Sequence, residues 1–481
     1  MTGCGTDSDA RPGRSCSATT PGTTRRRSGK QSWRRWSAGG SPGVLVLRRR
    51  GKLRGARCRR KRTKRASTRE MKILLVHKFY YVEGGAERYF FNVKQLLEEH
   101  GHEVIPFAMQ HPRNEPTPYA AYFPSLVEAN GAGGGSPLQR LSNAARFVYN
   151  REAQRKLQQL IEDTRPDLAH VHGVYHHLSP AVLPVLKRAG IPVVFTLHEY
   201  KILCPGYLFL DGKGRVCEKC QGRAFWHAAV NRCFRGSYAG GALVAVESYV
   251  HRWLRSYRDN VDRFHSPSRF LRSKMIQYGW DGDRIDWLPY TLAVQEFVPH
   301  YEPGDYVVFV GRLQREKGIQ VLIEAMPLVE RARLVVVGTG PLEQPLRTRA
   351  KQLGLTNVEF VGYKSGQELR NLVAGARFTV VPSVVYDNSP LTIYESFSLG
   401  KPVVGARIGG IPELIEPGVD GELCEPGDPR SLAQAITSLW DRGEGIREMG
   451  KRAREKAERL FEPEQHYEKL MAIYEKASHA S

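Results

Sequence analysis

Short apolar runs alternate with amphipathic helical segments along most of this chain, and that alternation restricts the possible folds. Strands made almost entirely of apolar residues are typical of parallel sheets that helices cover on both faces. The segment after the first run places Tyr89, Val93, Leu96 and Leu97 on one helical face and ends near Gly101. The sequence therefore predicts an α/β fold of two doubly wound, Rossmann-like halves. The expected strands are 73–77, 104–107, 168–172, 193–197 and 264–266, then 307–310, 334–337, 358–361, 378–381 and 403–405.

The first 70 residues have a different composition. They contain 21 Lys and Arg against three acids, so they carry +18 of the formal net charge of +23. Their apolar run Val44–Leu47 is too short for a signal-peptide core or a membrane span, and we expect residues 1–70 to be a disordered basic tail. Two interpretations stay open: an arm that binds nucleic acid or anionic lipid, or an extension ahead of a true start at Met71. The other 411 residues carry only +5, which favours an enzyme without a nucleic-acid partner.

Proline and glycine interrupt the periodicity at residues 298–304 and predict a linker there. The expected domains are therefore 71–297 and 305–462, with a last helix at 463–481 that packs back toward the first domain. No apolar run reaches the ~18 residues of a transmembrane helix, so any membrane contact would be peripheral. The cysteine pattern is not that of a disulfide scaffold, and we expect a cytoplasmic location that allows contact with the inner face of the cell membrane.

The segment Gly311–Gly318 follows an apolar run and contains Arg312 and Lys317. Gly311 would let the backbone approach a pyrophosphate, and the two cations would stabilise a diphosphate that gains charge as it departs. Basic residues are also common at the solvated start of a helix, so the motif alone leaves both interpretations open.

A second motif, Asp387–Glu395, follows a later strand. Pro390 suits a helix start, which would turn the free amides of Leu391 and Thr392 toward an anion. Asp387 and Glu395 would then approach hydroxyl groups. The alternatives are that Asp387 caps the helix and that Glu395 is a surface residue.

Together these motifs resemble the family 4 retaining glycosyltransferases, known as group 1. That family has the GT-B architecture, in which two Rossmann-like domains face each other across a cleft. The resemblance extends from Met71 to about Ala477. It rests on Glu83–Glu87, His170–His172, Thr196–Glu199, Ser266–Ser268, Gly311–Gly318, Val337–Pro341, Phe360–Gly362, Pro382–Ser383, Asp387–Glu395 and Gly409–Glu413.

The resemblance implies an acceptor-side N-terminal domain and a C-terminal domain that binds a nucleotide sugar. Arg312 and Lys317 would hold the leaving group, Glu395 the ribose, and Asp387 the transferred sugar. The family has Glu where this chain has Asp387, which puts the sugar contact in question. Other implied donor-site residues are Gly84 and Gly85 at the diphosphate, Gly338 and Gly340 beside the nucleotide, and Gly362 with Tyr363 at the base.

On the acceptor side, His172 and His198 stand at the ends of expected strands, where either can be catalytic or structural. His198 and Glu199 are the acceptor-binding candidates, although the family often has Asp at the position of Glu199. No Ser/His/Asp or Cys/His nucleophile set stands out, and no metal is required at the reaction centre. The resemblance implies retention through attack on the face from which the nucleotide leaves.

Four cysteines, Cys204, Cys217, Cys220 and Cys233, fall in an insertion at 204–233. One Cys-x2-Cys pair with two outlying cysteines could hold a structural zinc ion. Free thiols, an iron–sulfur cluster and disulfides are the other interpretations.

The predicted function is transfer of a sugar from a UDP- or GDP-sugar to a hydroxyl of a glycan, glycolipid or secondary metabolite. A sugar-nucleotide epimerase or hydrolase is the enzymatic alternative. A nucleic-acid- or membrane-binding protein that uses the basic tail is the alternative of another class.

Overall fold

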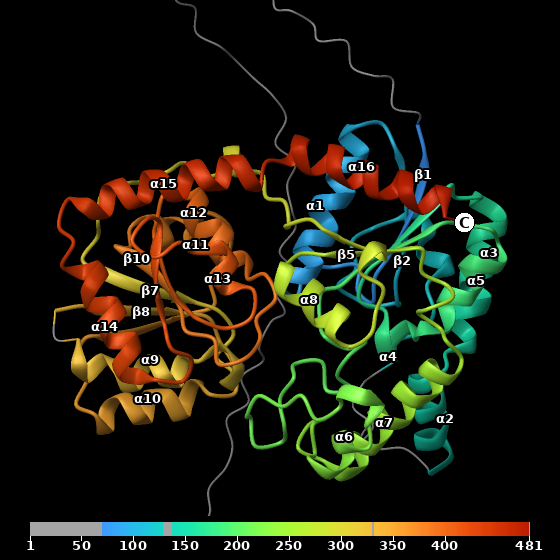
Figure 1. Cartoon of the computed structure of the whole chain (residues 1–481), viewed down its shortest axis with the longest axis horizontal. Helices are drawn as coiled ribbons and strands as arrows, with labels where there is room; N and C mark the ends of the chain where they lie inside the picture. The colour runs from blue at the N-terminus through green and yellow to red at the C-terminus, as the bar shows by residue number, and fades with distance from the viewer. Residues whose placement is uncertain (1–69, 128–136, 330, 481) are drawn as a thin grey trace, which may run out of the picture. The chain divides into compact units, whose positions relative to one another are not determined.

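The structure, a computed structural model, describes residues 70–127, 137–329 and 331–480. Apart from Glu70, the predicted basic tail lies outside the described residues. Two parallel six-stranded sheets with helices around them form the fold (Figure 1). The predicted α/β class with GT-B architecture is confirmed.

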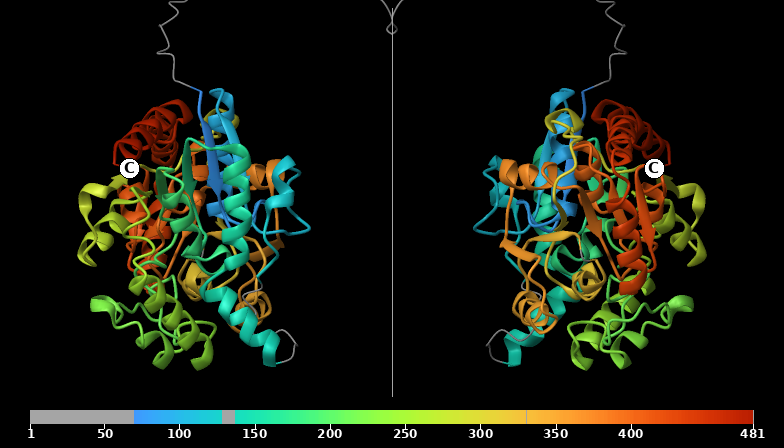
Figure 2. Two further views of the ribbon diagram at one scale, coloured as in Figure 1. Left: turned by 90° about the vertical axis from the view of Figure 1, so that its right-hand side faces the viewer. Right: turned by 90° about the vertical axis from the view of Figure 1, so that its left-hand side faces the viewer.

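The N-terminal sheet has the strand order β2-β1-β3-β4-β5-β6, and its inner strands are buried on both faces. Figure 2 shows helices on either side of these strands. The sequence prediction missed the short β6, which contains only three residues, one of them an aspartate. The strands are β1 Lys72–Val76, β2 Glu103–Phe107, β3 Leu168–Val171, β4 Val193–Thr196, β5 Arg263–Ser266 and β6 Ile285–Trp287. The helices are α1 Gly85–Glu99, α2 Pro137–Val148, α3 Arg151–Thr164, α4 Tyr175–Leu178, α5 Leu183–Arg188, α6 His227–Val230, α7 Tyr238–Trp253 and α8 Arg269–Gln277.

The C-terminal sheet has the order β12-β11-β10-β7-β8-β9. The sequence prediction also missed β12, whose four residues include a glycine and a glutamate. The strands are β7 Tyr306–Val310, β8 Arg333–Val337, β9 Val358–Gly362, β10 Phe378–Val381, β11 Val403–Ala406 and β12 Gly421–Cys424. The helices are α9 Ile319–Ala325, α10 Glu343–Gln352, α11 Gly366–Ala374, α12 Leu391–Ser398, α13 Ile411–Leu414, α14 Pro429–Trp440, α15 Gly445–Leu460 and α16 Pro463–His479.

The last helix, α16, packs against β4 and β5 of the N-terminal sheet. Its apolar stripe includes Leu470 and Tyr474, which are buried. Two of its tyrosines help to fix its position: His102 Nε2 donates to the Tyr467 hydroxyl at 2.8 Å, since His102 Nδ1 accepts from the Met71 amide, and the Tyr474 hydroxyl lies 2.8 Å from His170 Nδ1. The chain thus crosses back to the first sheet after completing the second.

The order of the strands in each sheet indicates where a ligand site can lie. In each sheet the order reverses next to its first strand, between β1 and β3 and between β7 and β10. Loops that leave neighbouring strands at such a switch point run to opposite faces, and the space between them is where open α/β sheets bind ligands. The motifs with Gly84, His172, Lys317 and Asp387 follow these four strands, and others follow β4, β8 and β9.

Candidate functional site

The loops after β7 and β10 meet at a salt bridge. Lys317 Nζ lies 2.7 Å from Asp387 Oδ2, and the Ser383 hydroxyl donates to the same oxygen at 2.8 Å. Gly318 permits this approach because its φ is +68°, and a Cβ there would lie 1.7 Å from the Pro382 carbonyl oxygen. The site therefore begins with a fixed ion pair that joins the two predicted motifs.

This ion pair keeps Asp387 ionised. Burial alone would raise the pKa of Asp387, but the Lys317 ammonium and the Ser383 hydroxyl hold it below its usual range. Asp387 therefore acts as a hydrogen-bond acceptor at neutral pH. Sugar hydroxyls can donate to such a carboxylate.

Arg312 lies on the same loop as Lys317 and is exposed. Among the described residues its side chain forms neither a hydrogen bond nor a salt bridge. Gly338 and Gly340, predicted to border the nucleotide, pack against this loop: a Cβ at Gly338 would lie 2.0 Å from the Gly311 carbonyl oxygen. The glycines thus have a packing reason to be there, because they let the loops after β7 and β8 touch.

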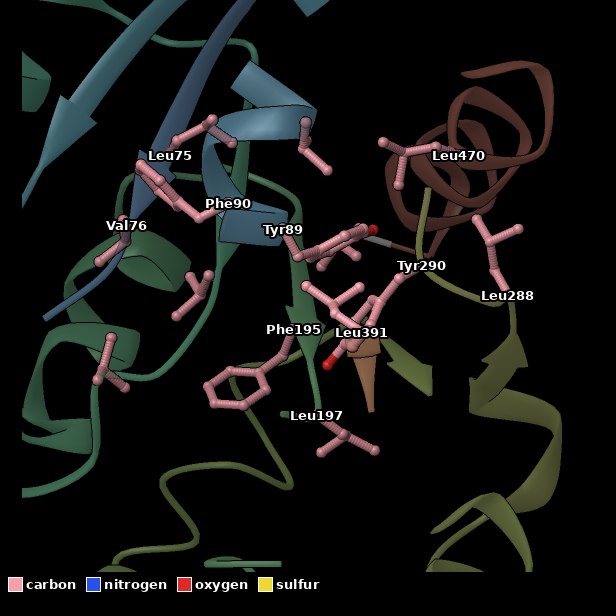
Figure 3. Packing of buried hydrophobic residues seen from close by; sticks show 14 of the residues in the cluster. Leu75, Val76, Tyr89, Phe90, Phe195, Leu197, Leu288, Tyr290, Leu391 and Leu470 are labelled. Carbon is pink, nitrogen blue, oxygen red and sulfur yellow. The ribbon is translucent and has the colours of Figure 1, made fainter. Parts of the chain in front are cut away.

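The N-termini of α1 and α12 approach each other. A Cβ on Gly85 would lie 3.6 Å from Leu391 Cδ1, while Gly84 is the residue before α1. Figure 3 shows Leu391 next to Tyr89 and Tyr290, and all three are buried. The first amides of a helix have no acceptor within it, so the amides of Leu391 and Thr392 are available to an anion.

Glu395, in the second turn of α12, forms a salt bridge with Arg88 of α1. Burial raises the pKa of Glu395, and the Arg88 guanidinium opposes that shift. Both residues line a cavity of about 270 Å³ that Gly366 and Arg370 of α11 also border. Sequence reasoning did not find Arg88, because nothing local distinguishes it from the surface arginines of other helices.

Gly362 and Tyr363, the predicted base-binding turn, end β9 and lead toward α11. Gly362 has a φ of +74° and accepts a hydrogen bond from the amide of Gly338 at 2.8 Å. The Tyr363 side chain is 71 % exposed, which leaves its ring free to stack on a planar ligand.

The predicted histidines of the N-terminal domain lie side by side. His172 Nδ1 lies 2.9 Å from His198 Nε2, and His198 Nδ1 lies 2.7 Å from the Tyr290 hydroxyl. Burial holds the pKa of both histidines well below the usual value, and the neighbouring histidines lower it further. Both are therefore neutral at physiological pH and can only donate or accept hydrogen bonds.

Several buried polar atoms near these histidines have no hydrogen-bond partner among the described residues. They are the Nε2 atoms of His77 and His172 and the hydroxyls of Tyr175 and Tyr200. Buried polar atoms are normally paired, so orphans that gather at the carboxyl ends of β1, β3 and β4 indicate a polar ligand. Sequence reasoning missed His77, Tyr175 and Tyr200, although His77 follows β1 as His172 follows β3.

Glu199 faces a cation rather than the histidine beside it. Its carboxylate lies 3.8 Å from Lys78 Nζ, and the same ammonium lies 3.8 Å from Glu87. Burial raises the pKa of Glu87, and Lys78 opposes the shift. Lys78 and Glu87 therefore belong to the acceptor-side neighbourhood; the sequence singled out Glu87 only as part of the Glu83–Glu87 motif and did not single out Lys78.

Asn388 joins the two halves of the site. Its amide donates to the Leu197 carbonyl oxygen at 2.9 Å, and its own oxygen accepts from the Ser268 hydroxyl at 2.6 Å. Glu413 accepts from the backbone amides of Arg269 and Phe270 at the start of α8. Asp387 is consequently held close to the strand end that carries His198.

The cysteine insertion borders the site through Glu218, which accepts from the Tyr386 hydroxyl and from Lys274, both at 2.7 Å. Burial raises the pKa of Cys220 to about 12, and the other three cysteines of the insertion add to that shift. Cys220 and Cys233 pack among Phe147, Phe225 and Phe234.

All four cysteines are free thiols, and within the described ranges no three His, Cys, Asp or Glu side chains are placed to hold one metal ion. The geometry therefore does not supply the four-thiolate site that the spacing predicted. Cys220 and Cys233 belong to the small apolar cluster and Cys204 to the large core of the chain, and the zinc hypothesis stays a prediction of the sequence. The part of the chain that the structure describes also contains no helix that is both long and apolar enough to cross a membrane.

Comparison with known families agrees with this geometry. A family model described as Glycosyl transferases group 1 matches residues 294–456, and one described as Glycosyltransferase Family 4 matches residues 83–290. The two matches cover both sheets and every motif discussed above except those in the first strand and the last helix.

Two curated relatives match over part of the chain. An uncharacterised glycosyltransferase of Methanocaldococcus jannaschii is 38 % identical over 278 residues, which cover 56 % of this chain and 65 % of that protein. The O-antigen chain mannosyltransferase C of Escherichia coli is 31 % identical over 176 residues, covering 36 % of this chain and 47 % of that protein. The chain thus spans less than two thirds of the length of these curated relatives.

Among solved structures, Anabaena HepE in complex with UDP and glucose has a TM-score of 0.57 and 19 % identity. The match covers 84 % of this chain and 100 % of that one. At this identity the likeness concerns the fold.

Proposed function

Because this chain belongs to the family 4, group 1 glycosyltransferases, we propose that it transfers a sugar from a UDP- or GDP-sugar to a hydroxyl acceptor with retention at the anomeric carbon. The Lys317–Asp387 pair carries this proposal, because it sets a cation and an ionised acceptor side by side at the switch point of the C-terminal sheet. The acceptor class is a glycan or a glycolipid. The mannosyltransferase among the relatives, which by its name builds an O-antigen chain, supports that choice.

The donor lies along the C-terminal sheet in this proposal. Its diphosphate contacts Arg312, Lys317 and the first amides of α12, and the ribose hydroxyls donate to Glu395. Charge grows on the diphosphate as the glycosidic bond breaks, so these fixed cations stabilise the transition state more than the ground state. HepE was solved with UDP, and that supports a nucleoside diphosphate as leaving group.

The acceptor and the transferred sugar meet at the N-terminal sheet. Asp387 accepts from sugar hydroxyls, and neutral His172 and His198 exchange hydrogen bonds with the sugar or the acceptor. The unpartnered atoms of His77 and Tyr175 give further polar contacts. With attack from the face that the diphosphate leaves, the departing phosphate oxygen can take the proton of the acceptor hydroxyl.

A donor panel tests the proposal. UDP- and GDP-sugars are scored for binding by calorimetry and for nucleotide release with and without glycan or glycolipid acceptors, and NMR of the product reads the anomeric configuration. We expect one donor to bind at micromolar to millimolar concentration, acceptor-dependent release of its nucleotide, and a product of unchanged configuration. Release that is independent of every acceptor indicates hydrolysis, and an inverted product refutes retention.

Arg312→Ala gives the sharpest variant, because the exposed side chain has no partner whose loss would disturb the fold. We expect kcat/KM to fall about 100-fold, as when one donor to a developing anion is removed. Arg315→Ala, also an exposed arginine in this loop, is the matched control and should keep the wild-type rate. Equal effects of the two changes would contradict the leaving-group role.

A further inference from the structure

Helix α7 is apolar on its outer face as well as on its inner one. Val244 and Ala245 are buried, while on the opposite side Tyr238, Val246 and Trp253 are 64, 52 and 82 % exposed. With Ala242 and Tyr249 these outer residues recur every three or four positions and form one stripe, here called the α7 stripe. Contiguous apolar surface of this kind marks an interaction site rather than a solvated helix face.

Arginines surround the α7 stripe. Residues 223–258 contain six arginines and a single acidic residue, Glu247. Glu247 is buried and lies 2.5 Å from Lys201 Nζ, so it does not neutralise them. Just beyond, Asp259 pairs with Arg255. The six are Arg223, Arg232, Arg235, Arg252, Arg255 and Arg258.

Four of these arginines, here called the arginine cavity, line a hollow of about 570 Å³ at the C-terminal end of α7. They are Arg223, Arg252, Arg255 and Arg258. Burial lowers the pKa of Arg252, and the charges of Arg223 and Arg258 lower it further. Neither Arg223 nor Arg252 has a salt bridge within the part of the chain that the structure describes. Glu247 also lines the hollow but pairs with Lys201, and Arg255 pairs with Asp259. The charges of Arg223 and Arg252 are therefore left for an anion from outside to balance.

Tyr257 gives a second sign of a ligand in the arginine cavity. Its ring is nine-tenths buried and lines the hollow, yet its hydroxyl has no hydrogen-bond partner among the described residues. Trp280, which stacks on Arg258 at 4.6 Å, closes another wall. A phosphate oxygen that accepts from the Tyr257 hydroxyl would supply the partner that this buried donor lacks.

We propose that the α7 stripe and the arginine cavity form a docking surface for an anionic lipid bilayer. The stripe enters the boundary between headgroups and acyl chains, where Trp and Tyr are favoured, and a lipid phosphate occupies the arginine cavity. A soluble phosphate would use the cavity but leave the stripe without a function. In Figure 1, α6 and α7 lie together in green, below the N-terminal sheet.

The surface is connected to the acceptor side of the site. The Lys201–Glu247 salt bridge joins α7 to the segment that begins at His198, three residues before Lys201. A bilayer held against α7 would therefore lie next to the strand end that carries His198. This consequence, unlike the docking itself, rests on the proposed function.

Co-sedimentation of the full chain with vesicles tests the proposal. Vesicles of pure phosphatidylcholine are compared with vesicles that contain phosphatidylglycerol, over a range of salt concentrations. We expect Val246→Asp with Trp253→Asp, and separately Arg223→Glu with Arg252→Glu, to weaken the partition coefficient on anionic vesicles by about tenfold each. Brominated lipids should quench wild-type tryptophan fluorescence, and Trp253→Phe should lose that quenched component.

Matched controls separate this surface from general charge and hydrophobicity. Val298→Asp changes an exposed apolar residue elsewhere, and Lys351→Glu with Arg430→Glu changes net charge by the same amount. Both controls should bind vesicles as the wild type does. Binding that the docking variants leave intact would assign the membrane contact to the basic tail and overturn the proposal.

Two other results would also overturn it. One is that millimolar inorganic phosphate releases the protein from vesicles while Val246→Asp with Trp253→Asp binds vesicles normally. That result would indicate that the ligand of the arginine cavity is a soluble anion. The other is concentration-dependent dimerisation without lipid that Val246→Asp abolishes, which would assign the stripe to a second copy of the chain. Donor binding by each variant, measured in solution, checks that the fold and the proposed function survive.

Discussion

The carboxyl ends of the two sheets differ in how they present polar groups. At the C-terminal sheet, Lys317, Asp387 and Arg312 provide charges, and the first two are already paired. At the N-terminal sheet, His77, His172 and His198 are buried, and burial keeps all three neutral. In the proposed function the charged side would bind the anionic diphosphate and the neutral side the uncharged hydroxyls. The contrast shows that burial, as well as residue type, decides whether a polar side chain in the site is charged or neutral.

The largest expected effect comes from removing the paired cation. Lys317→Ala should lower kcat/KM about 1,000-fold, because the leaving group loses a cation and buried Asp387 loses its counter-ion. Steady-state kinetics measure this, and thermal melting checks the fold. Lys364→Ala, at an exposed ion pair beside α11, is the control and should stay within about twofold. If Lys317→Ala kept most of its activity, the assignment of Lys317 to the leaving group would be wrong.

Lowering the pH should destabilise the N-terminal domain, because its buried histidines are neutral in the folded state. Burial lowers the pKa of His265 to about 4 and that of His466 to about 3. Between pH 6.5 and 5 the unfolded chain binds protons at these positions and the folded chain does not. Each histidine should therefore cost about 2 kcal/mol of unfolding free energy at pH 5, a stability that is fully present above pH 6.5.

Urea unfolding at pH 7.5 and pH 5 measures this loss. His466→Gln should reduce the pH dependence, whereas His479→Gln, at an exposed position, should leave it unchanged. Glu87 and Glu395 act in the opposite sense, because burial raises their pKa values and they favour the folded state as pH falls. A free energy that does not change over this range would show that the histidines titrate normally.

The cysteine insertion lies beside the site, and its metal content can be tested separately from the two sheets. If Cys220 binds zinc, as the sequence predicts, purified protein should contain one zinc per chain, and Cys220→Ser should lose it. Cys424→Ser, at a buried cysteine of the other sheet, should keep the metal and cost only about 1–2 kcal/mol of stability. Metal analysis and urea unfolding measure both. If the wild-type protein contained no zinc and the two variants lost equal unfolding free energy, the cysteines of the insertion would serve only in apolar packing.

Arg88→Ala should have the smallest effect and tests where the two halves join. Without the guanidinium the pKa of Glu395 rises further, so more of this carboxyl is protonated at low pH and accepts fewer hydrogen bonds. We expect nucleotide affinity to fall about threefold to tenfold at pH 6 and less at pH 8, as measured by calorimetry. Gln95→Ala, on the same helix and the same cavity, should not change affinity. Tighter binding after the loss of Arg88 would show that its salt bridge competes with the donor.

Much of this fold can be read from the sequence, because buried parallel strands are nearly continuous apolar runs. The prediction failed at Ile285–Trp287 and Gly421–Cys424, where strands at the sheet edges are short and mixed in polarity. Lys317 and Asp387 were both identified, but as separate ligand contacts rather than as partners of one another. Their pairing depends on the close approach of Gly318 and Pro382, which no local pattern encodes.

Residues that act across the two domains were harder to find. Arg88 and Asn388 become distinctive only when α1 lies beside α12 and when β4 lies beside the loop after β10. His77 carries a weak signal, since it follows its strand as His172 does. Local chemistry thus predicts the residues of one loop, whereas contacts between distant segments need the tertiary structure.

Asn388 also has a consequence for the speed of turnover. Asn388 directly follows Asp387, whose carboxylate pairs with Lys317. The Asn388 amide donates to the Leu197 carbonyl oxygen, and its side-chain oxygen accepts from the Ser268 hydroxyl. Any separation of the sheets that admits substrate or frees product must break both hydrogen bonds and also release Glu413 from α8. In the proposed reaction, release of the Asn388 side chain would be a step of every such separation, and its rate would set an upper limit on turnover.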